Sequence, residues 1–188
     1  YMTRAPSLLS GDAAAAYDSL VRTGSTPVVL EADAAGLTDA LRSAGVIVDC
    51  LLGIGSSGAP RAPMAQVIDA MNDSGAAILA CDVPSGVDAN TGATVGACVH
   101  AAETLTIGYP KPGLLLGAGA DCTGRLRIAD IGFPRARALE LGPHAYVLER
   151  EDAVALLPSR PRAAHKGTFG RALIIAGSVG MTGAAGLA

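Results

Sequence analysis

Apolar and polar positions follow two alternating periods along the first 133 residues. Apolar residues three or four positions apart predict helices over 10–24, 36–45 and 63–75. Short, mostly apolar runs predict strands over 26–32, 46–52, 76–81, 102–108 and, more exposed, 124–132. Apolar strands that alternate with helices are typical of a parallel sheet covered on both faces. We therefore predict a three-layer, Rossmann-like α/β domain with a mainly parallel sheet.

The pattern changes after residue 133. Residues 134–148 begin a more charged, proline-containing stretch, which we interpret as a linker. Residues 149–188 predict a short helix near 152–157, a strand over 171–176, a glycine-rich turn and the start of a helix. A strand and one incipient helix cannot bury a core alone. We expect a second domain of which only the beginning is present, and a chain that is truncated at both ends.

Composition narrows the class of protein. Of the 188 residues, 50% are hydrophobic and 16% charged, which favours a folded domain over a disordered one. A net charge of -3 gives no reason to expect nucleic acid, and no apolar run is long enough to predict a membrane span. Four cysteines form no C-x-x-C pair and have no close histidine in the pattern. We expect inert core thiols in a cytoplasmic protein that acts on a small molecule.

One glycine pattern follows the strand predicted over 46–52. Gly53, Gly55 and Gly58 spell G-x-G-x-x-G, and Asp82 lies 24 residues after Gly58, where dinucleotide-binding turns place an acidic ribose ligand. Such a turn must run straight into a helix. Pro60 and the next proline intervene here, so the pattern disfavours a nicotinamide-dependent dehydrogenase.

Carboxylates stand at the ends of two predicted strands. Asp49 and Asp82 end strands, Ser85 follows in a sharp turn, and Lys111 lies just after a third strand. Carboxyl ends of parallel strands meet at one edge, where such sheets bind ligands. Oxygen ligands there suit a hard cation or a proton transfer. The alternatives are a structural Asp49 bonded to loop amides, a plain turn over 81–92, and a solvated Lys111.

In this order, the stretches DCLLGIG, DVPSGVDANTG, KPGLLLG and GRLRIADIG resemble the NAD(P)H-hydrate epimerase family, the YjeF N-terminal domains. The resemblance covers roughly residues 1–133. The stretch AHKGTFGRALIIAGSVGMTGAAGLA resembles the opening of the ADP- or ATP-dependent NAD(P)H-hydrate dehydratase, whose fold is ribokinase-like. The two domains are commonly fused in this order in one bifunctional repair protein.

The resemblance implies roles for residues. Asp82 is the expected catalytic acid or base and contacts the hydrated nucleotide, Asp49 and Ser85 are the expected potassium ligands, and Lys111 receives no role. The expected substrate-binding residues are Gly53, Ile54, Gly55, Ser56, Ser57, Gly58 and Ala59, with Ala184 in the dehydratase part. The implied activity interconverts the R and S forms of hydrated NADH or NADPH. The fused dehydratase would restore the S form with ADP or ATP, and a homo-oligomer is compatible with the sequence.

One departure from the family affects this expectation. The family carries an N-N-G-G-D-G loop after its first strand, and the sequence contains none. We therefore expect the isolated chain to be inactive. The alternative is a non-catalytic module that binds a nucleotide or a protein on the same fold.

Overall fold

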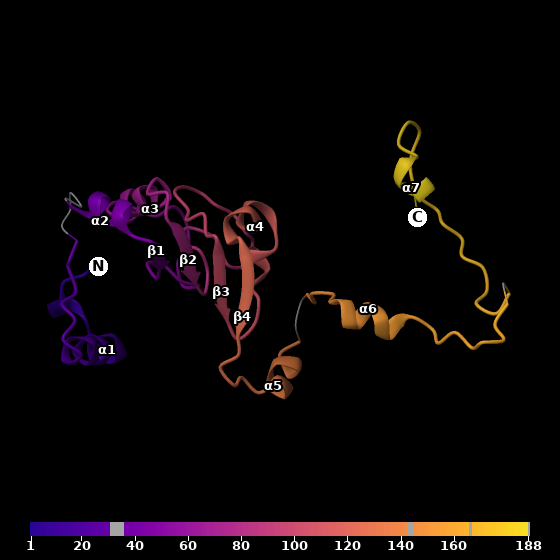
Figure 1. The fold of residues 1–188 in the computed structure, drawn as a ribbon, viewed down its shortest axis with the longest axis horizontal. Coiled ribbons are helices and arrows are strands. Elements are labelled where there is room, and N and C mark those ends of the chain that lie inside the picture. The colour runs from indigo at the N-terminus through magenta and orange to yellow at the C-terminus, as the bar shows by residue number, and fades with distance from the viewer. Residues whose placement is uncertain (31–35, 143–144, 166, 188) are drawn as a thin grey trace. The chain divides into compact units, whose positions relative to one another are not determined.

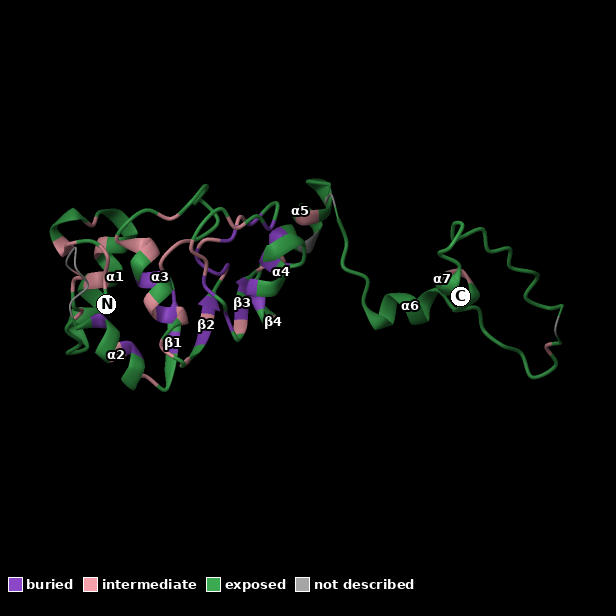
Figure 2. Ribbon diagram, turned by 90° about the horizontal axis from the view of Figure 1, so that it is seen from above, coloured by how far each residue is buried: buried purple, intermediate pink, exposed green. Residues whose placement is uncertain are grey.

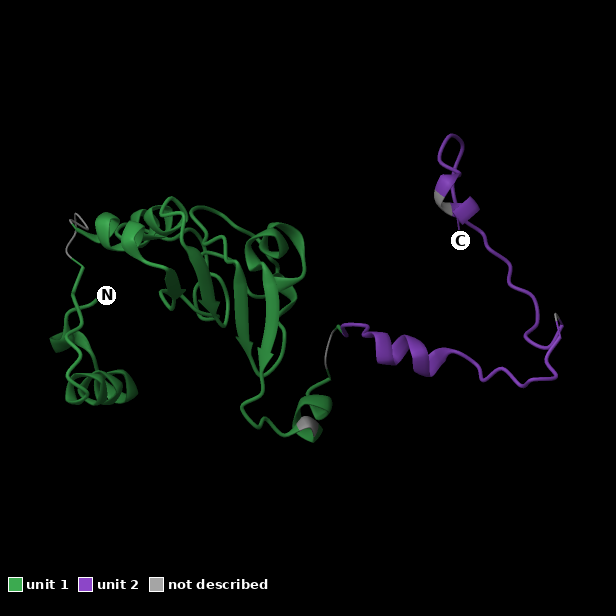
Figure 3. Ribbon diagram, in the orientation of Figure 1, with its two compact units in different colours: residues 1–145 green, residues 146–188 purple. Residues whose placement is uncertain are grey.

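The computed structural model describes residues 1–30, 36–142, 145–165 and 167–187. The chain forms two compact units, residues 1–145 and 146–188 (Figures 1 and 3). The helices and strands of the first unit are η1 (Pro6–Leu8), α1 (Gly11–Arg22), α2 (Leu37–Ser43), β1 (Val46–Asp49), α3 (Met64–Asn72), β2 (Ala77–Cys81), β3 (Glu103–Ile107), η2 (Pro112–Leu114), α4 (Gly117–Thr123), β4 (Arg125–Ala129) and α5 (Arg135–Glu140). In the described part of the chain, every helix is too short or too polar to cross a membrane.

The four strands form one parallel sheet in the order β1-β2-β3-β4. Val46 pairs with Ala77 across the first two strands, and Thr104 with Leu126 across the last two. The predicted α/β class and parallel sheet are therefore confirmed. The sheet brings the carboxyl ends of all four strands to one edge.

One face of the sheet carries the core. Ile47, Ile78 and Ala80 point to this face and pack against α2 and α3, where Ile68 has no exposed surface. A second cluster joins α4 to the same face through Leu126, which packs with Val83, Val87, Ala89, Leu114 and Cys122. Buried residues concentrate in these strands and in the helices packed on them (Figure 2).

The opposite face of the sheet differs from the predicted two-sided coverage. Val46 and Val48 are 58% and 56% exposed, and Leu105 and Ile107 are also exposed. Cys50 and Cys81, expected in the core, are exposed as well. The strand order explains this difference. The four strands lie side by side in the order in which they occur in the chain. Right-handed crossovers between such strands all lie on the same face of the sheet.

Two predicted strands are not formed as expected. In place of a strand over 26–32, the described residues show a single parallel bridge between Met2 and Val29, and residues 31–32 lie outside the described ranges. Over 171–176 the chain is irregular, and Leu173 and Ile175 are 85% and 89% exposed. A strand needs a hydrogen-bonded neighbour, and the described part of the second unit provides none for this stretch.

Short helices also form in the second unit and in part of the predicted linker. The second unit contains α6 (Arg150–Leu156), close to the predicted helix, and α7 (Gly183–Leu187). Glu149 and Asp152 form a capping box at the start of α6, which explains why this exposed helix begins there. Within the stretch predicted as a linker, residues 135–140 form α5.

The core at α3 yields a stability prediction. We expect Ile68→Ala to lower the free energy of unfolding by about 2–5 kcal/mol, because it leaves a cavity at a site with no exposed surface. Leu20→Ala, in α1 at 45% exposure, should change it by less than about 0.5 kcal/mol. Denaturant unfolding of both variants measures this. Equal losses would show that α3 does not form the core.

Candidate functional site at the carboxyl edge of the sheet

Polar side chains gather at the carboxyl edge, as the sequence predicts. Asp49 is the last residue of β1, Asp82 follows β2, and Lys111 follows β3 and contacts Asp82. Ser85 lies three residues after Asp82, in the turn that leaves β2. Because all the strands are parallel, these groups belong to one edge of the sheet.

Asp49 and Ser85 form one buried hydrogen-bonded unit, and each is 1% exposed. The Ser85 amide donates to Asp49 Oδ2 at 2.8 Å, and the Ser85 hydroxyl donates to Oδ1 at 2.7 Å. The Leu51 amide also donates to Oδ1, at 3.1 Å. These donors satisfy the buried carboxylate, so the structural alternative for Asp49 describes its contacts well. The unit fixes the end of β1 to the turn after β2.

Asp82 has different surroundings. Its Oδ1 accepts hydrogen bonds from the Ile107 amide at 3.0 Å, from the Thr106 hydroxyl at 3.3 Å and from Lys111 Nζ. Among the residues that the structure describes, none donates to Asp82 Oδ2. The side chains of Asp82 and Lys111 are each 18% exposed, so the carboxylate is not fully enclosed.

Two further features single out Asp82. Its φ angle is 72°, which few residues other than glycine adopt and which asparagine and aspartate tolerate best. Burial alone would raise the pKa of Asp82. Hydrogen bonds from Lys111 and the Ile107 amide, together with the charge of Lys111, outweigh it and hold the pKa below its ordinary value. Asp82 is therefore an anion at neutral pH, set in a strained backbone conformation.

Lys111 was given no role from the sequence, yet it completes this cluster. Lys111 Nζ also donates to Thr106 Oγ1 and to the Ile107 carbonyl, both at 2.9 Å. All three ammonium protons are thus used. The solvated alternative for Lys111 does not describe these contacts. Thr106 was missed altogether, and its only signal in the sequence is a hydroxyl inside an apolar strand.

The loop Gly53–Ala59 borders a small hollow of about 60 Å³. Pro84, Gly86 and Asp88 contribute from the turn after β2, and the loop contributes Gly53, Ser56, Ser57 and Gly58. Pockets for whole drug-sized ligands hold about 300–1,000 Å³, so this hollow suits a fragment such as one phosphate. Asp82 and Lys111 do not line it. Of the other predicted loop residues, Ile54 is exposed and Ala59 packs near Gly96.

The loop is not a dinucleotide turn of the dehydrogenase type. The helix that follows, α3, begins at Met64, after the prolines and not at Gly58. Its N-terminal amides therefore do not follow the glycines directly, as that motif requires.

Other motif residues are structural. Asp88 Oδ1 accepts hydrogen bonds from the amides of Asn90 and Thr91 at 3.0 and 2.8 Å, which closes the turn. A Cβ at Gly113 would lie 2.0 Å from the Asp88 carbonyl oxygen, so only glycine fits there. Ala184, expected to face a substrate, falls in α7, and its side chain lies outside the described part of the structure.

Comparison with known proteins identifies the family. The model of the YjeF-related protein N-terminus matches residues 1–113. The chain belongs to this family. It is 38% identical over 179 residues to the bifunctional NAD(P)H-hydrate repair enzyme Nnr of Thermofilum pendens, covering 95% of this chain and 33% of that protein. It is 42% identical over 142 residues to Nnr of Escherichia coli, covering 76% of this chain and 27% of that protein.

The YjeF-related chain spans about a third or less of the length of these curated relatives. Among solved structures, yeast ynu0, YNL200c, aligns with a TM-score of 0.57 at 18% identity, over 76% of this chain and 59% of that one. This likeness supports the fold described above.

The depressed pKa of Asp82 yields a pH prediction. The ionised carboxylate stabilises the folded protein at neutral pH, because its pKa is lower there than in the unfolded chain. This contribution is lost as the pH falls from the ordinary value of about 3.9 through the folded pKa. Asp82→Asn should therefore be less stable than wild type at neutral pH, with a gap that narrows below pH about 4.

Unfolding free energies measured across this pH range check the prediction. The matched control is Asp18→Asn, which removes an exposed carboxylate on α1. A gap for Asp82→Asn that is independent of pH would contradict the ion pair with Lys111.

Proposed function

We propose that residues 1–133 act on hydrated NADH and NADPH and interconvert their R and S epimers. The observation that carries this proposal is the Asp82 carboxylate, whose Oδ1 is held by Lys111, Thr106 and the Ile107 amide while no described residue donates to Oδ2. Membership of the YjeF-related family supports it, as do relatives that are named NAD(P)H-hydrate repair enzymes.

The proposed reaction is a proton-assisted exchange at C6 of the hydrated nicotinamide ring. The C–O bond of the hydroxyl breaks as the oxygen takes a proton and leaves as water, and the ring nitrogen supplies the electron pair. A water then adds to either face of the ring and gives up a proton. No electrons are gained or lost overall. The step requires one group that can donate and accept a proton within hydrogen-bond reach of the hydroxyl.

Asp82 suits this role through Oδ2. The three donors on Oδ1 fix the carboxylate plane, so the second oxygen presents a defined direction to a ligand. Because the pKa of Asp82 lies below its ordinary value, the resting group is the anion, and it first takes a proton from solvent. The resulting acid protonates the departing hydroxyl. The carboxylate that this leaves takes a proton from the water that adds, and later returns it to solvent. Lys111 positions the carboxylate, and its charge favours the anion.

The loop Gly53–Ala59 would hold a phosphate of the nucleotide. Its two serine hydroxyls, Ser56 and Ser57, and the turn through Pro84 and Gly86 line a hollow of that size. The nicotinamide end would then extend along the carboxyl edge towards Asp82. In this arrangement the loop supplies binding and Asp82 supplies the proton transfer.

The chemistry of their ligand atoms suits Asp49 and Ser85 to a potassium ion. Both offer oxygen atoms, which hard cations prefer. Asp49 Oδ2 accepts one hydrogen bond, and the Ser85 hydroxyl accepts one from the Leu52 amide at 2.9 Å, so each retains a lone pair. When bound, the ion would supply positive charge beside the substrate phosphate. The chain's own contribution is a rigid pair of oxygens.

Residues 149–188 are proposed as the beginning of a dehydratase domain that uses ADP or ATP, with residues 134–148 as the linker. The support is the order of the motifs in the sequence and the separation of residues 146–188 as a unit. Relatives named bifunctional align with both parts of the chain.

Asp82→Asn tests the proton-transfer role. Asparagine keeps the shape of the side chain and tolerates a positive φ, so the fold should persist. In the full-length protein, epimer exchange should slow by about 10²–10⁴-fold, the usual contribution of a positioned acid or base. Chromatography of purified NADH hydrate, with the spontaneous rate subtracted, measures the exchange.

Asp130→Asn is the matched control for this experiment. Asp130 follows β4 at the same edge and accepts a hydrogen bond from the Gly132 amide at 2.8 Å, so its loss should leave the exchange rate unchanged. A folded Asp82→Asn protein with the wild-type rate would reduce Asp82 to a turn residue and end the proposal.

Ser85→Ala tests the ion-binding role separately. Removal of this hydroxyl takes a donor from Asp49 and an acceptor from the Leu52 amide, so we expect a loss of stability of about 1–3 kcal/mol. Potassium dependence and the KM for the hydrate should change more than kcat. A fall in kcat alone, with potassium dependence unaltered, would contradict an ion held by Asp49 and Ser85.

A further inference from the structure

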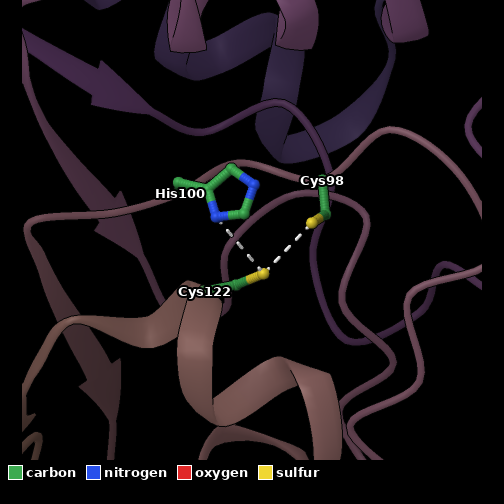
Figure 4. A group of neighbouring side chains, drawn as sticks. All are labelled: Cys98, His100 and Cys122. Atoms are coloured by element: carbon green, nitrogen blue, oxygen red, sulfur yellow. Dashed lines mark hydrogen bonds between the residues drawn. The ribbon is translucent and has the colours of Figure 1, made fainter.

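Two cysteines and a histidine meet on the covered side of the sheet. Cys98 Sγ lies 3.1 Å from Cys122 Sγ, which in turn lies 3.8 Å from His100 Nδ1. The three ligand atoms all lie within 4.8 Å of one another, and their side chains point to a common centre (Figure 4). The expectation of cysteines without a close histidine is therefore wrong for this pair. Cys122 is buried and His100 is exposed, so the group opens to solvent on the histidine side.

The backbone around this group is held by specific hydrogen bonds. The Asn72 side chain donates to the Cys98 carbonyl at 2.8 Å and accepts from the His100 amide at 3.0 Å. The Ala101 amide donates to the Cys122 carbonyl at 2.9 Å, which joins the same segment to α4. One amide side chain thus fixes the spacing of Cys98 and His100, and the third ligand is tied to the residue after them.

We propose that Cys98, His100 and Cys122 bind one soft divalent cation of the Zn²⁺ type, with a fourth position open to water. Zinc binds cysteine sulfur at about 2.3 Å and histidine nitrogen at about 2.0–2.1 Å, which for a tetrahedral ion separates two sulfurs by about 3.8 Å. The present sulfur separation of 3.1 Å and sulfur–nitrogen separation of 3.8 Å come within about 1 Å of this arrangement. Small side-chain rotations suffice to close the site.

The second cysteine pair shows why the histidine matters. Cys50 and Cys81 also lie near each other, at the ends of β1 and β2. Among the described residues, only Cys98, His100 and Cys122 bring three such ligands together. A disulfide between two cysteines would need no histidine. The arrangement of His100 on the same centre favours a cation.

The proposed cation would lie directly behind the turn of the candidate site. The Val99 amide donates to the Ser85 carbonyl at 2.9 Å, and a Cβ at Gly86 would lie 2.2 Å from the Ala97 carbonyl oxygen. The segment that carries Cys98 and His100 therefore packs against residues 85–86. A cation there would stabilise this packing and make the folded state more stable.

Metal titration of the purified, reduced protein tests the site. We expect one Zn²⁺ per chain, a rise in Tm on addition of Zn²⁺, and a thiolate-to-cobalt charge-transfer band in the near ultraviolet with Co²⁺. Cys98→Ser, Cys122→Ser and His100→Ala should each weaken Zn²⁺ binding by at least about 10-fold. The double variant Cys50→Ser/Cys81→Ser is the matched control and should bind as wild type does.

Three results would overturn the proposal. The first is that the reduced protein binds no Zn²⁺, and the second is that the Co²⁺ complex lacks the thiolate band. The third is that Zn²⁺ binding is lost in the Cys50→Ser/Cys81→Ser variant and kept in the Cys98, Cys122 and His100 variants. If the protein as purified contains a Cys98–Cys122 disulfide, and the reduced protein binds no Zn²⁺, the pair would have a redox role instead. If Cys122→Ser fails to fold, His100→Ala still decides, because His100 is exposed and its loss should leave the fold intact.

Discussion

The carboxylate of Asp49 lies buried at the end of β1, where a charge without donors would destabilise the fold by several kcal/mol. Ser85 meets this requirement with its amide and its hydroxyl, and so ties the turn after β2 to the end of β1. This turn also accepts a hydrogen bond from the segment 97–99, and it borders the loop Gly53–Ala59. The geometry of the carboxyl edge therefore depends on this one pair.

Asp49 and Asp82 show how the same residue type acquires different roles from its surroundings. Asp49 is enclosed, and both of its oxygens accept hydrogen bonds from the protein. Asp82 is partly exposed, and its bonds converge on a single oxygen. The first arrangement suits a structural or ion-binding group, and the second suits a group that exchanges protons with a ligand. Burial and the distribution of donors separate the two.

The sequence predicted which residues lie at the carboxyl edge, because their placement follows from local pattern alone. Apolar runs that end in Asp49 and Asp82 must place both at one edge once the strands are parallel. The contact between Asp82 and Lys111 joins residues far apart in the chain, and a lysine between two prolines carries no sign of a partner. The cluster of Cys98, His100 and Cys122 was missed for a similar reason. Its third member lies on α4, whose sequence GAGADCT has a weak helical pattern.

The open face of the sheet and the irregular stretch 171–176 show where local pattern fails. An apolar run looks the same whether one face or both faces find partners. Which of these occurs depends on strand order and on the presence of neighbouring strands. Val46 and Val48 are as apolar as Ile47, yet only Ile47 is buried.

The central claim is that the carboxyl edge binds a hydrated nicotinamide nucleotide. Amide chemical shifts of the ¹⁵N-labelled protein, followed while purified NADH hydrate is added, test it most directly. The account predicts saturable shifts in the loop 53–59 and in residues 106–111, with β4 residues 125–128 unaffected. Saturating hydrate that leaves both stretches unchanged would contradict it.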